Sequence, residues 1–98
     1  MTKLIEEFIL QLHNEKNTSS NTEISYKRDL NKLYDYLKKE NFNDDITTIT
    51  EEDLKRYVAY LNDIGRAPTT ISRNIASVKA FFGFLCDKGI IHENYATN

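Results

Sequence analysis

Apolar residues recur along this chain at intervals of three and four, the spacing that places side chains on one face of an α-helix. The pattern falls into four stretches, and we predict helices over residues 2–16, 20–39, 51–64 and 69–88. No stretch shows the strict alternation of a half-buried strand. The sequence therefore predicts an all-α fold, a compact four-helix bundle. Its core should include Leu30, Leu37, Leu61, Ile75, Val78 and Phe82.

Two predicted helix starts carry the spacing of a capping box, in which a side chain and a backbone N–H satisfy each other across one turn. Ser20 is followed three residues later by Glu23, and Thr50 is followed by Asp53. Gly65 stands just after the third predicted helix, where a left-handed residue commonly ends a helix. These signals support the predicted starts of the second and third helices and the predicted end of the third.

Length and composition narrow the class of protein. Ninety-eight residues suffice for one domain with a modest core, so we expect residues 1–98 to form a single domain. No apolar run approaches the roughly 20 residues that span a membrane, and no signal-peptide pattern follows Met1. The lone Cys86 cannot form an internal disulfide, which suits a reducing compartment. We therefore predict a cytoplasmic protein without a membrane partner.

Charge is informative in its distribution rather than in its total. The net charge of −2 gives no general support for nucleic-acid binding. Residues 66–88, however, contain four cations against a single acid, Asp87. A local basic face on an acidic protein can still bind phosphates, because binding depends on the local field. Ordinary solvated surface charges would give the same composition.

The fourth predicted helix has a side that is both small and cationic. Ala76, Ala80 and Gly83 recur at i, i+4 and i+7 and would let another surface approach closely. The hydroxyls and cations beside them suit phosphate oxygens and base edges. They are Thr69, Thr70, Ser72, Arg73, Ser77 and Lys79. The small residues would equally suit packing against another helix of the bundle.

The second predicted helix carries a similar polar stripe opposite its apolar face. This stripe consists of Asn21, Ser25, Arg28 and Lys32. Two such faces in one small bundle can form a cradle for a duplex, although Asp29 and Asp35 lie nearby. The arrangement favours DNA as a partner.

Conventional catalytic and metal-binding patterns are missing from the sequence. His13 and His92 lie far apart, and neither has a second ligand at helical spacing. There is no Gly-rich phosphate loop and no nucleophile elbow. We expect no metal, no cofactor and no catalytic residue in this chain.

Two segments resemble the signatures of the N-terminal core-binding domain of the tyrosine recombinases, or phage-type integrases, of the Xer-like kind. They read SSNTEISYKRDLNKLYDYL and TTISRNIASVKAFFGFLCDKGIIHEN. The resemblance implies a SAM-like four-helix fold that clamps one face of a core recombination half-site. In that family, a separate C-terminal domain cleaves the DNA strand. No catalytic motif of that kind occurs in these 98 residues, so we expect this chain to be non-catalytic.

The resemblance and the charge pattern together predict the residues that contact double-stranded DNA. They are Thr22, Ser25, Tyr26, Arg28, Lys32, Arg66, Thr69, Thr70, Ser72, Arg73, Ser77 and Lys79. The family also implies contacts between recombinase protomers through the first helix, whereas the isolated domain is expected to be monomeric. A helical protein–protein interaction module is the alternative. It is supported by Phe84 and Tyr60, two aromatic residues that lie off the predicted apolar stripes and are expected to be exposed.

Overall fold

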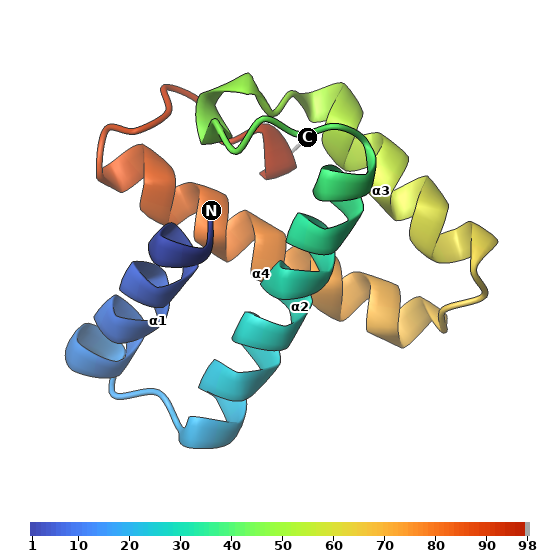
Figure 1. Ribbon diagram of the computed structural model, residues 1–98. Coiled ribbons are helices and arrows are strands. Elements are labelled where there is room, and N and C mark those ends of the chain that lie inside the picture. Colours follow the sequence, from blue (N-terminus) through green and yellow to red (C-terminus); the bar gives the residue numbers. More distant parts are fainter. Residues whose placement is uncertain (98) are drawn as a thin grey trace. The chain divides into compact units, whose positions relative to one another are not determined.

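A computed structural model describes residues 1–97, and over this range it contains four α-helices, two short 3-10 turns and no strand (Figure 1). The helices are α1 (Thr2–Lys16), α2 (Ser20–Lys39), α3 (Glu51–Asp63) and α4 (Pro68–Asp87), and the turns are η1 (Ile46–Thr48) and η2 (Tyr95–Thr97). The all-α, four-helix prediction is confirmed, and each predicted boundary lies within one residue of the observed one. In the described part of the chain, no helix is long and apolar enough to cross a membrane.

The chain divides into two compact units, the first over Met1–Asp44 and the second starting at Asp45. In the first unit, α1 and α2 lie side by side (Figure 1). The buried side chains of α1 are Ile5, Phe8 and Leu12, and the buried apolar ones of α2 are Leu30, Leu33, Tyr36 and Leu37. The 3.6-residue spacing of the apolar positions therefore gives each helix a buried face.

The start of α2 differs from the prediction. Ser19 is the N-cap, and its hydroxyl accepts a hydrogen bond from the Thr22 backbone N–H at 3.2 Å. The predicted capping box from Ser20 to Glu23 is therefore wrong, because Ser20 is already the first helical residue. The Glu23 carboxylate instead accepts a hydrogen bond from Thr18 Oγ1 at 2.7 Å. This bond lowers the pKa of Glu23 below its ordinary value of 4.5.

In the second unit, α3 and α4 are joined by a short connection at residues 64–67. Thr50 and Asp53 form the predicted capping box at the start of α3, which is confirmed. Gly65 has a φ of 81° just beyond the end of α3, a conformation that glycine adopts without strain. Pro68 occupies the first turn of α4, where its missing N–H is not needed.

The buried arc of α4 is wider than the predicted apolar stripe. Val78, Phe82 and Leu61 are buried as predicted, but Ile75 is only half-buried. Phe84, predicted to be exposed, is 4% exposed and therefore belongs to the interior. The remaining buried apolar side chains of α4 are Ile71, Phe81 and Leu85.

Candidate nucleic-acid interface

The outer face of α4 is exposed over its first three turns. Thr69, Ser72, Arg73 and Lys79 are all exposed, and Ala76 lies exposed among them. At about 100° per residue, these five positions fall within one sector of the helix, opposite the buried residues. We call this set, Thr69, Ser72, Arg73, Ala76 and Lys79, the α4 outer face. It presents two hydroxyls and two cations around a small residue.

Two predicted contact residues of α4 lie toward its buried side. Thr70 is half-buried, and Ser77 is 2% exposed with its hydroxyl donating to the Arg73 carbonyl oxygen at 3.2 Å. Seven residues separate them, so they share one side of the helix. In this structure the Ser77 hydroxyl is therefore directed to the backbone rather than to an exposed surface.

Asn74 lies on the same side of α4 and was missed by sequence reasoning. It is 0% exposed, its Oδ1 accepts a hydrogen bond from the Tyr57 hydroxyl of α3 at 3.3 Å, and its Nδ2 donates to the Thr70 carbonyl oxygen at 2.8 Å. A buried amide requires such partners, because an unsatisfied polar group in the interior is costly. Its position, three residues after Ile71 and four before Val78, was the signal that an amide interrupts the apolar stripe.

The row of small residues on α4 has two different environments. Ala76 is exposed, whereas Gly83 faces the segment that follows the helix. A Cβ added at Gly83 would lie 3.7 Å from Asn94 Nδ2. Gly83 therefore borders a segment of the same chain, whereas Ala76 remains open.

The polar stripe of α2 is also largely accessible. Asn21 and Arg28 are exposed, and Ser25 and Lys32 are half-buried. Asp29 is 0% exposed and lies on another side of the helix. Asp35 lies 3.4 Å from Lys38 and is partly neutralised by it. Ser25, Arg28 and Lys32 thus form a cationic face, which we call the α2 face.

Two further predicted contacts of α2 lie outside the α2 face. The Thr22 hydroxyl is exposed and lies 2.9 Å from the Ser19 hydroxyl at the helix start. The Tyr26 ring is half-buried and packs edge-to-face on Phe8 of α1, with ring centroids 5.8 Å apart. Tyr26 therefore contributes to packing in the first unit.

Arg66 lies exposed in the connection before α4. The N-cap residue of α4 is Ala67, which offers no side chain to the first backbone N–H groups, and the first turn contains no acidic residue. A helix N-terminus carries partial positive charge. The start of α4 is therefore electrostatically favourable for an anion, in the company of Arg66 and Thr69.

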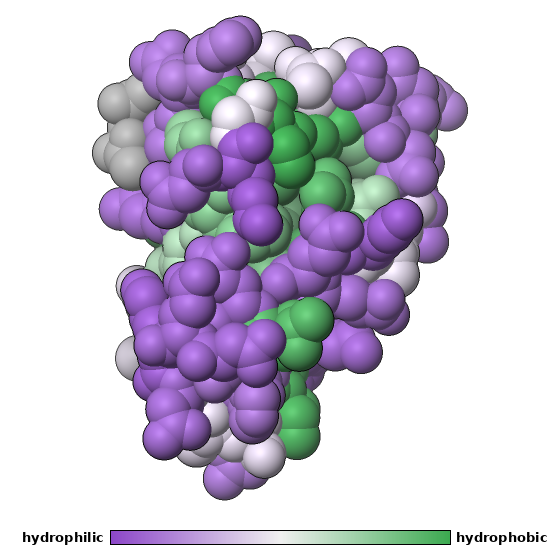
Figure 2. Space-filling view, turned by 90° about the vertical axis from the view of Figure 1, so that its left-hand side faces the viewer, coloured by the Kyte–Doolittle hydropathy of each residue, from purple (hydrophilic) through white to green (hydrophobic). Residues whose placement is uncertain are grey.

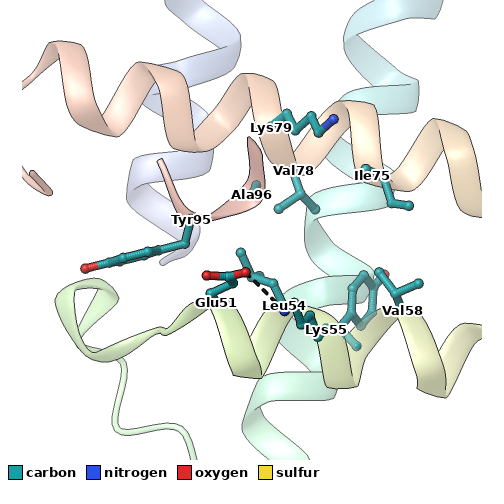
Figure 3. A pocket seen from close by; sticks show the side chains of 10 residues that line it. Glu51, Leu54, Lys55, Val58, Ile75, Val78, Lys79, Tyr95 and Ala96 are labelled. Atoms are coloured by element: carbon teal, nitrogen blue, oxygen red, sulfur yellow. Dashed lines mark ion pairs between the residues drawn. The ribbon is translucent and has the colours of Figure 1, made fainter. Parts of the chain in front are cut away.

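Among the described residues, no group of three or more His, Cys, Asp or Glu side chains could hold a metal ion. A pocket of about 140 Å³ lies in the second unit, lined mainly by apolar side chains of α3, α4 and η2 (Figure 3).

Residues 5–89 match the family described as "Phage integrase, N-terminal SAM-like domain", and the chain belongs to this family. Among its curated relatives are the tyrosine recombinase XerC of Chlorobaculum tepidum, 32% identical over 90% of this chain, and the tyrosine recombinase XerD of Listeria innocua, 33% identical over 91% of this chain. A XerD of Oceanobacillus iheyensis is 37% identical over 83% of the chain. The resemblance seen in the two sequence segments is thereby confirmed.

The chain spans less than a third of the length of these curated relatives, since the matches cover 28%, 30% and 27% of them. No solved structure matches the chain. The family membership thus concerns an N-terminal domain.

Proposed function

We propose that this chain is the DNA-binding domain of a site-specific tyrosine recombinase and contacts the core recombination half-site. In this proposal the domain is non-catalytic, acts in the cytoplasm as one folded domain, and serves a parent recombinase that cleaves and rejoins DNA. The relatives carry the name tyrosine recombinase, which supports the parent activity.

The α4 outer face is the observation that carries the proposal. Arg73 and Lys79 are exposed, and α4 contains no acidic residue before Asp87. Over residues 68–86, the only charged side chains of α4 are therefore positive. Arginine and lysine bind phosphate oxygens, and hydroxyls such as those of Thr69 and Ser72 add neutral hydrogen bonds. The matching residue types on the α2 face provide a second set of contacts.

The remaining predicted contacts are ranked by their exposure. Arg66 and Thr22 are exposed and are proposed to bind the DNA backbone. Thr70 and Tyr26 are half-buried, so each would contribute only its hydroxyl. Ser77 would have to exchange its bond to the Arg73 carbonyl for a bond to DNA, which makes it the weakest member of the set.

An NMR titration of the chain with labelled duplex DNA at two salt concentrations tests the proposal. The candidate cations Arg28, Lys32, Arg66, Arg73 and Lys79 give about five phosphate contacts and a log–log salt slope near −4 to −5. The expected dissociation constant for random duplexes is on the order of 10⁻⁴ to 10⁻⁶ M at physiological salt. Amide shifts should fall at residues 21–32 and 66–80. Shifts confined to α1, or no shift at low salt, would remove DNA as the partner of these faces.

A second candidate function is protein–protein contact through the first unit. Leu10 of α1 and Ile24 of α2 are 59% and 58% exposed. The lower half of Figure 2 shows small apolar areas within a mainly hydrophilic surface there. The original support for this alternative is weaker, because Phe84 is buried and Tyr60 is half-buried. Sedimentation of the wild-type chain and a Leu10→Ser variant tests this candidate. Self-association through α1 should be seen with the wild-type chain and be lost in the variant.

A further inference from the structure

The segment that follows α4 folds back onto the second unit. The Ile90 backbone N–H donates to the Leu85 carbonyl oxygen at 3.0 Å, and Ile91 is 6% exposed. The chain then reaches η2, which packs against both α3 and α4. This C-terminal turn contains only three residues. Hydrogen bonds within such a short 3-10 turn do not attach it to the helices. Its position must therefore come from contacts with the rest of the unit.

Asn94 provides two of these contacts with one side chain. Its Nδ2 donates to the Lys79 carbonyl oxygen of α4 at 3.1 Å, and its Oδ1 accepts from the Ala96 backbone N–H at 3.0 Å. The first bond fixes the turn to α4, and the second fixes the shape of the turn itself. Gly83 lies beside this amide, since a Cβ added there would be in ordinary van der Waals contact with Asn94 Nδ2 at 3.7 Å.

The docked turn forms one wall of the pocket in the second unit. Figure 3 shows Ala96 facing the apolar side chains of Leu54 and Val78, while the Tyr95 hydroxyl points away from them. Displacing the turn would expose this apolar lining to water, which is unfavourable. The C-terminal turn thus covers one side of this apolar lining.

We propose that Asn94 is a latch that holds the C-terminal turn against the pocket between α3 and α4. Loss of the latch releases the turn and uncovers the apolar lining, while the helices remain folded. The device belongs to the second unit alone and requires no DNA, so it can be tested independently of the proposed function.

Four variants of the full chain separate the two bonds. Asn94→Ala removes both, and Asn94→Asp keeps an acceptor for the Ala96 N–H but loses the donor to Lys79. Gly83→Leu leaves Asn94 unchanged and fills the space beside its amide. Gly83→Ala is the matched control, because the added Cβ would make only an ordinary contact at 3.7 Å.

Amide exchange at Ala96, methyl shifts of Leu54 and Val78, and fluorescence of an apolar dye provide the readouts, with circular dichroism to verify the helices. Asn94→Ala should speed exchange of the Ala96 amide by about three- to tenfold, as expected for a lost hydrogen bond. It should also shift both sets of methyls and increase dye fluorescence. Asn94→Asp and Gly83→Leu should shift the methyls and increase fluorescence, and Gly83→Ala should do neither.

Unchanged methyl shifts and fluorescence in folded Asn94→Ala would show that the turn is held without Asn94 and would overturn the proposal. Should Asn94→Ala fail to fold, Gly83→Leu and Asn94→Asp decide the question. If both fold and both keep the wild-type methyl shifts, the latch does not exist.

Discussion

Helices α3 and α4 lie in the same unit and share a buried hydrogen bond, yet their charges are arranged in opposite ways. Each carries two cations. In α3, Lys55 lies 3.1 Å from Glu51 and Arg56 lies 3.7 Å from Glu52, so acids one turn earlier on the same helix offset both. In α4, neither Arg73 nor Lys79 has an acidic residue within four positions. The number of cations is equal, and the two helices differ in the acids that their own sequences place beside those cations.

The two helix starts differ in the same way. Thr50 and Asp53 close the N-terminus of α3 reciprocally, and its first turn contains three acids. The start of α4 has no side-chain cap and no acid. Because a helix N-terminus attracts anions, acids satisfy this attraction inside α3 and would repel a phosphate there. We therefore propose α4 for the DNA surface because its sequence places no acid beside its cations or at its start, and not because it has more lysine and arginine than α3.

The largest expected effect is a loss of stability on replacing a buried side chain of α4. Phe82 is 0% exposed, and Phe82→Ala should lower the free energy of unfolding by about 3–5 kcal/mol. Arg73→Ala is the control, because an exposed substitution should stay within about 0.5 kcal/mol. Urea unfolding followed by circular dichroism measures both. Equal stability of the two variants would mean that the faces of α4 are assigned the wrong way round.

Because only α3 has a side-chain cap, replacing a threonine at each helix start should lower the free energy of unfolding by different amounts. Thr50→Ala should lower the free energy of unfolding by about 1 kcal/mol, because it removes the side-chain cap of α3. Thr69→Ala in the first turn of α4 should have an effect of only a few tenths, since no cap bond is lost there. Thermal unfolding of both variants checks the difference. A larger loss for Thr69→Ala would show that α4 has a cap of its own.

Arg73 of α4 and Arg56 of α3 test whether an acid on the same helix affects DNA binding. If Arg73 contacts a phosphate, Arg73→Ala should reduce the magnitude of the salt slope by about 1 on every duplex sequence. This corresponds to about a fourfold difference in relative affinity between 50 and 200 mM salt. Arg56→Ala, which removes a cation offset by Glu52, should leave the slope unchanged. Similar slopes for the two variants in a fluorescence anisotropy titration would show that intrahelical pairing does not govern binding.

The smallest expected effect is the pH dependence of a third helix start, that of α2. The hydrogen bond from Thr18 and the neighbouring His13 hold the pKa of Glu23 below its ordinary value of 4.5. The Glu23 carboxylate therefore stabilises the fold above pH 4.5, and this contribution is lost as the pH falls through the lowered pKa. Glu23→Gln should be slightly less stable than the wild type at pH 7, and the difference should shrink by pH 3. A difference in Tm that stays constant with pH would show that Glu23 does not act as a charge.

The helices themselves were predictable because their information is local. Apolar spacing, the Thr50–Asp53 pair and Gly65 all act within one or two turns, so the boundaries followed from short-range physics. The Ser20–Glu23 pair failed because Ser19, one residue earlier, offers the same hydroxyl and took the cap position. Neighbouring serines give a pattern that spacing cannot resolve.

The buried polar groups and the width of the buried arc were less predictable. Asp29, Asn74 and Phe84 are all buried, although none lies on the apolar stripe predicted for its helix. How much of a helix is covered depends on segments remote in the sequence, which periodicity does not reveal. The same gap affects the site, because it determines that Ser72 and Arg73 are exposed whereas Ser77 is buried.

The hydrogen bond between Tyr57 and Asn74 also determines the angular setting of α4. Asn74 directly follows Arg73, so the two side chains project about 100° apart on the helix. Rotating α4 about its axis by one position, so that Arg73 takes the place of Asn74, would break the hydrogen bond to Tyr57 and turn the guanidinium toward the interior. The buried pair, together with the buried apolar side chains of α4, therefore fixes which residues the helix presents on its outer face. Under the proposed function, substitutions that break the Tyr57–Asn74 hydrogen bond should weaken DNA binding by the outer face before they unfold the helix.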